Sequence, residues 1–150
     1  MSSTVHAEIE IAAPPTVVFD TVMDPGRLAD WVTIHRSVTL ISGDAVSEGA
    51  RMDQVLHIRG VSFKVHWTLV AVTRPREAEW VGRGPAMSHA LIRYRLVGGV
   101  DGPTKFAYTN EFSAPGGIIG NLASHVVVGH APEREAHDSL MKLKSLLEDR

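Results

Sequence analysis

A chain of 150 residues with 44% hydrophobic content is long enough to build one core by itself. It has no cysteine, which excludes disulfides, thiolate zinc sites and cysteine nucleophiles. Its formal net charge is -2 with acidic and basic residues interspersed, so neither a nucleic-acid partner nor an anionic membrane surface is expected.

The N-terminal residues and the lengths of the apolar runs indicate whether the protein is exported or inserted in a membrane. Residues 1–4 are polar and contain neither a basic stretch before an apolar run nor a cleavage motif. The longest apolar runs fall far short of the ~20 residues that a membrane span needs. We therefore expect a single cytoplasmic domain over residues 1–150, without stable membrane insertion.

The N-terminal third predicts one strand and two short helices. Apolar and polar side chains alternate over residues 5–11, which indicates a strand with one buried face. Prolines at 14–15 end it and suit the first turn of a helix over 16–23. After a break at 24–26, a second short helix is expected over 27–31.

The middle of the chain predicts a meandering antiparallel sheet. Short links rich in glycine, proline and aspartate separate the strands, and short links favour antiparallel neighbours. The expected strands are 36–42, 50–59, 61–73, 77–83, 87–97 and 104–113.

Spacings of three and four residues predict a long C-terminal helix with one buried stripe. That stripe comprises Leu122, Val126, Gly129, Glu133, Ala136, Leu140, Leu143 and Leu147. Pro132 interrupts the pattern, so a kink or a restart of the helix is expected near Ala131.

Alternation within the strands also predicts which side chains face inward. The inward set is rich in rings and comprises Met52, Gln54, Leu56, Ile58, Val61, Phe63, Val65, Trp67, Leu69, Trp80, Ser88, Ala90, Ile92, Tyr94, Leu96, Phe106, Tyr108, Asn110 and Phe112. Such rings either fill a core or offer flat faces to a planar ligand, and the pattern leaves both interpretations open.

Two amides, Gln54 and Asn110, fall on this apolar face. An amide buried without a hydrogen-bond partner costs roughly 1–3 kcal/mol. Each should therefore bond to the other, to a buried water, to the backbone or to a polar atom of a ligand. Tyr94 and Tyr108 are the other expected donors.

Glu133 falls on the helix stripe. A carboxyl that faced an apolar interior would be a candidate general acid or base. Alternatively, it occupies the first turn of a restarted helix, where the dipole favours a solvated carboxylate.

Metal, nucleophile and nucleotide motifs are missing from the sequence. His125, His130 and His137 lie five and seven residues apart, without the i, i+4 pair of a helical metal site, so no metal is expected. Neither a Gly-x-Ser-x-Gly turn nor a glycine-rich phosphate loop before a helix occurs, so we expect no cofactor.

Segments at both ends of the chain resemble a known superfamily. They are residues 9–19 (IEIAAPPTVVF), Asp24-Pro25, Trp31, the strand 104–112 and the helix 135–148. They resemble the superfamily of lipid-transfer START domains, the birch pollen allergen and bacterial polyketide cyclase/dehydrase-like proteins (SRPBCC). The resemblance implies an α+β helix-grip fold: a curved antiparallel sheet of about seven strands around a long C-terminal helix, with two short helices between the first two strands.

The resemblance also implies a cavity between the sheet and the last helix, used by different members for lipids, sterols, quinones, plant hormones or polyketide intermediates. We expect binding, for transport or sequestration, of a hydrophobic or aromatic small molecule. The residues expected to bind it are Gln54, Phe63, Trp67, Trp80, Tyr94, Tyr108, Asn110, Phe112, Leu122 and Val126. The alternative is a polyketide cyclase or dehydratase in which Glu133, Tyr94 or Tyr108 moves protons.

A third interpretation is an interaction module whose outer sheet face pairs with another subunit. Leu91 lies beside Arg93 and Arg95 on an outward face and hints at such pairing. Monomer and homodimer both stay open.

Overall fold

The computed structural model describes residues 2–43, 47–58, 60–114 and 131–149. Its elements, in chain order, are β1 (Ser2–Ile11), α1 (Pro15–Met23), η1 (Pro25–Arg27), α2 (Leu28–Trp31), β2 (His35–Ser42), β3 (Arg51–Ile58), β4 (Val61–Thr73), β5 (Glu77–Arg83), η2 (Pro85–Met87), β6 (His89–Val97), β7 (Thr104–Ser113) and α4 (Ala131–Glu148). This is the α+β order that the sequence predicts.

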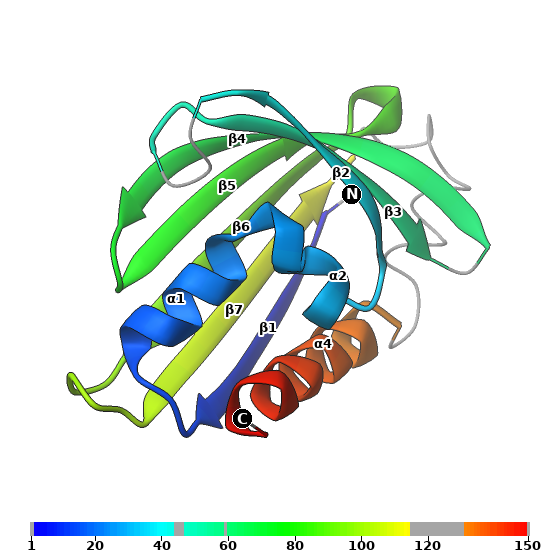
Figure 1. Cartoon of the computed structure of the whole chain (residues 1–150). Coiled ribbons are helices and arrows are strands. Elements are labelled where there is room, and N and C mark those ends of the chain that lie inside the picture. The colour runs from blue at the N-terminus through cyan, green and yellow to red at the C-terminus, as the bar shows by residue number, and fades with distance from the viewer. Residues whose placement is uncertain (1, 44–46, 59, 115–130, 150) are drawn as a thin grey trace.

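One antiparallel sheet contains the seven strands, in the order β1-β7-β6-β5-β4-β3-β2. Strands β2 to β7 pair with one another in sequence order. The first strand, β1, pairs with β7 and forms the edge of the sheet opposite β2. Figure 1 shows the sheet curving around the helices, with α4 along β1 and the two small helices over the concave face. This arrangement is the helix-grip fold.

The two prolines before α1 set where that helix begins. Pro14 is the N-cap in an extended conformation and Pro15 occupies the first helical position, where a missing N–H costs nothing. α1 ends before Asp24, whose backbone is extended. The Oδ1 atom of Asp24 accepts a hydrogen bond from the N–H of Gly26 at 2.9 Å. The turn at 24–26 thus places α2 directly after α1 on the same face of the sheet.

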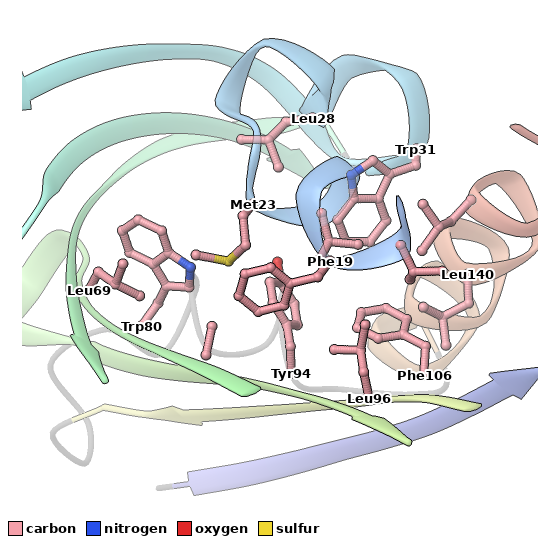
Figure 2. Close-up of a cluster of buried hydrophobic side chains, with 14 of the residues drawn as sticks. Phe19, Met23, Leu28, Trp31, Leu69, Trp80, Tyr94, Leu96, Phe106 and Leu140 are labelled. Atoms are coloured by element: carbon pink, nitrogen blue, oxygen red, sulfur yellow. The ribbon is translucent and has the colours of Figure 1, made fainter. Parts of the chain in front are cut away.

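Aromatic rings form the centre of the core. Phe106 on β7 is fully buried, and its ring centroid lies 5.4 Å from that of Tyr94 and 6.4 Å from that of Trp31. Figure 2 shows side chains of α1 and α2 lying over those of the sheet, with Leu140 of α4 beside Phe106. The small helices, the sheet and the last helix therefore share one core.

Polar contacts fix the C-terminal end of α4 to the end of β1. Lys144 Nζ donates to the carbonyl of Glu10 at 2.8 Å, and the N–H of Ala12 donates to Glu148 Oε2 at 2.8 Å. Hydrogen bonds from Lys144 and from the Ala12 N–H lower the pKa of the Glu148 carboxyl below its ordinary value. These contacts hold the helix at one edge of the sheet.

The structure shifts most predicted boundaries by at most one residue and corrects those of β1 and β6 by more. β1 begins at Ser2, because its pairing with β7 runs to Ser113. β6 begins at His89, because the preceding residues form a tight turn with left-handed backbone at Ala86 (φ 54°) and Met87 (φ 64°). α4 is described from Ala131, and the kink or restart expected near this residue stays a prediction, because residues 115–130 lie outside the described ranges.

The Gly82→Ala variant tests the close packing of β5 on β4. A Cβ at Gly82 would lie 2.6 Å from Val65 Cγ1 and 2.7 Å from Trp67 Cε3. We expect the free energy of unfolding, measured in urea, to fall by about 1–2 kcal/mol. The control is Gly99→Ala, because no atom lies within 4 Å of a Cβ there. An equal loss in the control would contradict the steric explanation.

Candidate functional site

A cavity of about 130 Å³ lies between the concave sheet face, the two small helices and α4. One water needs about 10–15 Å³ by the same measure, so the space admits an organic guest of several atoms. The residues that line it, called the cavity wall below, are mostly apolar or aromatic. The inward side chains thus leave room between them.

The structure places eight of the ten predicted ligand-binding residues on the cavity wall. They are Gln54, Phe63, Trp67, Trp80, Tyr94, Tyr108, Asn110 and Phe112. The other two, Leu122 and Val126, lie outside the described residues. That these side chains contact a ligand stays a prediction.

The last helix was expected to border the cavity, and Ala136 and Leu140 of its predicted stripe do line it. Sequence reasoning missed the contribution of the two small helices and two polar residues of α4: Met23, Leu28, Trp31, Glu135 and Ser139. Trp31, at the end of the second short helix, is only 2% exposed. Its position three residues after Leu28, on the same helix face, was the available signal.

Gln54 takes part in a hydrogen-bond chain that fixes both ends of its amide. The indole Nε1 of Trp67 donates to Gln54 Oε1 at 2.9 Å, and an indole nitrogen can only donate. Oε1 therefore faces Trp67, and Nε2 donates to Nδ1 of His35 at 2.8 Å. This buried amide is satisfied by protein side chains.

Asn110 differs, because one end of its amide has no partner among the described residues. Its Nδ2 donates to the Tyr108 hydroxyl at 3.1 Å. Its Oδ1 and the indole Nε1 of Trp31 are buried and have no hydrogen-bond partner among the described residues. Both residues line the cavity, and an unsatisfied buried polar atom costs about 1–3 kcal/mol unless water or a guest bonds to it.

The two tyrosines of the cavity wall keep their protons at neutral pH. Burial raises the pKa of Tyr108 to about 12, against a smaller lowering by its hydrogen bond with Asn110. Burial also raises the pKa of Tyr94 above its ordinary value. Their ring centroids are 6.1 Å apart. Both hydroxyls can therefore donate a hydrogen bond into the cavity, and neither is a base.

The carboxylate on the cavity wall is Glu135 and not Glu133. Glu133 is exposed in the first turn of α4, so the inward orientation that its catalytic role requires is not observed. Glu135 lines the cavity and accepts a hydrogen bond from the Thr33 hydroxyl. The backbone N–H of Thr33 also donates to Ser139 Oγ at 3.0 Å, which joins α4 to the segment after α2.

Within the described ranges, no cluster of three or more His, Asp or Glu side chains could hold a metal ion. Over the same residues, no helix combines the length and the apolarity that crossing a bilayer requires. His66 pairs with Asp53 at 2.7 Å, and His57 bonds to Ser62 at 2.8 Å, both away from the cavity wall.

His35 predicts a pH dependence of stability. Burial lowers its pKa below the ordinary value of 6.5, so the folded state takes up this proton at a lower pH than the unfolded chain does. The contribution of His35 to the free energy of unfolding should be constant well above pH 6.5 and should decrease as the pH falls through 6.5 and below. Urea unfolding at several pH values measures this decrease.

The control for this prediction is His35→Gln, which cannot titrate. Its free energy of unfolding should change less over the same pH interval, because only the group at position 35 differs. The hydrogen bond with Arg74 lowers the pKa of the Asp20 carboxyl below its ordinary value of 3.8. This carboxyl therefore changes the free energy of unfolding only at lower pH and does not contribute to the slope assigned to His35. An unchanged slope in His35→Gln would contradict the role of His35.

Solved structures share this fold at low sequence identity. The Zhui aromatase/cyclase from Streptomyces sp. R1128 superposes with a TM-score of 0.79 at 16% identity, covering 100% of this chain and 96% of that one. Ginseng major latex-like protein 151 from Panax ginseng gives 0.74 at 8% identity, with 98% of each chain covered. Ara h 8.0201 gives 0.65 at 12% identity over the full length of both chains.

Sequence comparisons give one family. No curated protein matches the sequence at a significant level. The family model described as "Polyketide cyclase / dehydrase and lipid transport" matches residues 2–148, nearly the whole chain. The chain therefore belongs to the polyketide cyclase/dehydrase and lipid transport family.

Proposed function

We propose that this protein binds a hydrophobic or aromatic small molecule in its cavity, for transport or sequestration. The supporting observation is a cavity wall built from rings and aliphatic side chains, in which the described residues supply few groups that titrate: Tyr94, Tyr108, His89 and Glu135. Apolar contact supplies affinity in such a site, and a few polar atoms supply orientation. The family description, which includes lipid transport, agrees with this proposal.

Native mass spectrometry of protein purified from its own host tests the proposal. A small molecule should accompany the protein, and a panel of quinones, sterols, fatty acids and polyketides should displace a bound fluorescent hydrophobe. Failure of every compound to displace the hydrophobe would count against a binding function.

A matched pair of variants distinguishes binding of the hydrophobe in the cavity from binding at the outer surface. Ala90 on β6 lines the cavity, whereas Ala107 on β7 does not. Ala90→Phe should weaken binding of the hydrophobe by about tenfold or more, because the added ring takes the guest's space. Ala107→Phe adds the same ring outside and should leave the affinity unchanged. Equal effects would show that the hydrophobe binds elsewhere.

The second candidate is an enzyme of the polyketide cyclase or dehydratase type. It is favoured by the tyrosine hydroxyls on the cavity wall and by the likeness to an aromatase/cyclase. A phenol that keeps its proton can donate to a carbonyl oxygen of the substrate and stabilise developing negative charge there. The Tyr94→Phe variant distinguishes the two functions.

If the protein is an enzyme, Tyr94→Phe should slow conversion of a poly-β-ketone thioester by about tenfold to a hundredfold. Affinity for the unreacted chain should change much less. If it is a binding protein, neither wild type nor variant should change the products that the thioester forms spontaneously. Product analysis by mass spectrometry gives the answer.

A further inference from the structure

A hydrogen-bond chain leads from the cavity wall to the first residue of β2. Trp67 and Gln54 line the cavity and are 3% and 5% exposed. The indole Nε1 of Trp67 donates to Gln54 Oε1 at 2.9 Å, and Gln54 Nε2 donates to His35 Nδ1 at 2.8 Å. His35 itself is half-buried and does not line the cavity. The chain therefore joins a histidine that solvent can reach to a ring on the cavity wall.

A register shift at the start of β2 accompanies this placement of His35. His35 pairs with Leu56, whereas Ser37 already pairs with Val55, so β2 has one residue more than β3 at this point. Such an extra residue re-aims the side chains beside it. Because β2 is also an edge strand, His35 contacts the buried amide of Gln54 from the rim of the sheet.

The direction of the hydrogen bonds in this chain is fixed at the tryptophan. An indole nitrogen can only donate, so Trp67 requires the oxygen of the Gln54 amide. The amide then presents its N–H group to His35, which can accept only through an unprotonated Nδ1. A protonated imidazole carries an N–H at both nitrogens, so the same contact would place two donors against each other. The observed chain is therefore compatible only with neutral His35.

Protonation of His35 disturbs the chain in either of two ways. If the Gln54 amide turns so that Oε1 accepts from protonated His35, Nε2 faces the indole N–H of Trp67, and the mismatch moves to the cavity wall. If the ring of His35 turns to solvent instead, Gln54 Nε2 loses its partner in a buried position. Either change weakens the contacts that position Gln54 and Trp67.

The charged groups around His35 are engaged elsewhere. The titratable side chains of the neighbouring β2, β3 and α2 are Arg36, Arg51, Asp53, His57 and Asp30, and α4 contributes Glu135 beside Thr33. Asp53 pairs with His66, Asp30 pairs with Arg27, and Glu135 accepts from the Thr33 hydroxyl. Burial lowers the pKa of His35, and no charged group among the described residues contributes to that shift.

We propose that His35 is a positioning residue that makes guest binding sensitive to protons: its protonation disturbs Gln54 and Trp67, and the cavity then holds its guest less tightly. The inference rests on the proposed function and adds a regulation of the same cavity. A guest that packs on Trp67 favours the arrangement with neutral His35. The guest should therefore lower the pKa of His35, and protonation should lower the affinity for the guest, because the coupling is reciprocal.

Titration with N-phenyl-1-naphthylamine, an uncharged fluorescent hydrophobe, tests the proposal. Its affinity for the wild type should fall about threefold to tenfold from about pH 7.5 to about pH 5.5, with circular dichroism confirming the folded chain at both. His35→Gln keeps an oxygen that can accept from Gln54 and cannot be charged, so the ratio of the two affinities should approach one. The matched control is His66→Gln on the outer face, which should keep the wild-type ratio.

Two results of this titration would overturn the proposal. One is a ratio near one in the wild type. The other is a wild-type ratio in His35→Gln, which would assign the proton to another histidine, such as His89 of the cavity wall. If the hydrophobe does not bind even at neutral pH, the proposed function itself fails at this cavity and the proposal falls with it. The two kinds of failure are therefore distinguishable.

The Trp67→Phe variant tests the chain without a guest. It removes the indole N–H, so the Gln54 amide is free to turn and to accept from protonated His35. The pKa of His35, measured by NMR from the imidazole Cε1–H signal, should rise above its wild-type value, although phenylalanine is no more polar than tryptophan. An unchanged pKa in the folded variant would overturn the role of Trp67.

The reciprocal measurement needs no variant. Saturating the wild type with N-phenyl-1-naphthylamine should lower the pKa of His35 in the same NMR titration. A purely structural role of His35 would leave this pKa unchanged by the hydrophobe, and that result would overturn the coupling whether or not Trp67→Phe folds.

Discussion

Phe106→Ala should lower the free energy of unfolding by about 3–5 kcal/mol, the largest effect expected of any single substitution considered for this protein. Phe106 is fully buried at the meeting point of β7, α2 and β6, against the rings of Trp31 and Tyr94. Packed neighbours cannot fill the space that the ring leaves, so a cavity cost adds to the lost burial. Urea unfolding measures the loss.

Phe112→Ala provides the matched control, since it deletes the same atoms from the same strand. Phe112 lines the cavity and is only partly buried, so part of its ring already lacks packed neighbours. We expect a loss of roughly 1 kcal/mol in stability, together with weaker binding of a ring-shaped guest. Equal losses of stability at the two positions would contradict the division of the interior into a packed core and an open cavity.

Gln54→Leu should lower the free energy of unfolding by about 2–4 kcal/mol, although leucine is more apolar and of similar size. The substitution leaves two polar groups without their partner, the Trp67 indole N–H and His35 Nδ1. Gln54 is 5% exposed, so water cannot readily replace it. Thermal and urea unfolding both measure the effect.

Asn110→Leu is the comparison for this amide. It removes an acceptor that has no partner among the described residues and one hydrogen bond to Tyr108, so the stability should change by less than about 1 kcal/mol. A loss as large as that of Gln54→Leu would show that Oδ1 of Asn110 is satisfied in solution by tightly bound water.

Much of the fold could be predicted from the sequence, because strands with one buried face show that face as alternation. The bounds expected for residues 61–73, 77–83 and 104–113 coincide with β4, β5 and β7. A turn was expected before β6, but its extension to Ser88 was missed, since left-handed backbone at Ala86 and Met87 occurs at residues that do not favour it.

The cavity wall could be predicted on the strands and on the buried stripe of the last helix, which includes Ala136 and Leu140. A short helix such as α2 has too few residues to show a period, so the spacing of Leu28 and Trp31 alone did not predict the burial of Trp31. Glu133 lies on the predicted stripe, seven residues before Leu140, but it is exposed in the first turn of α4, which the helical period alone does not reveal. Contacts with Thr33, distant in sequence, place Glu135 inward.

All three tryptophans of the chain line the cavity. Tryptophan fluorescence, excited selectively over that of the two tyrosines, therefore comes entirely from indoles of the cavity wall. Quenching or a wavelength shift on titration would register occupancy with no added label and no background from surface tryptophan.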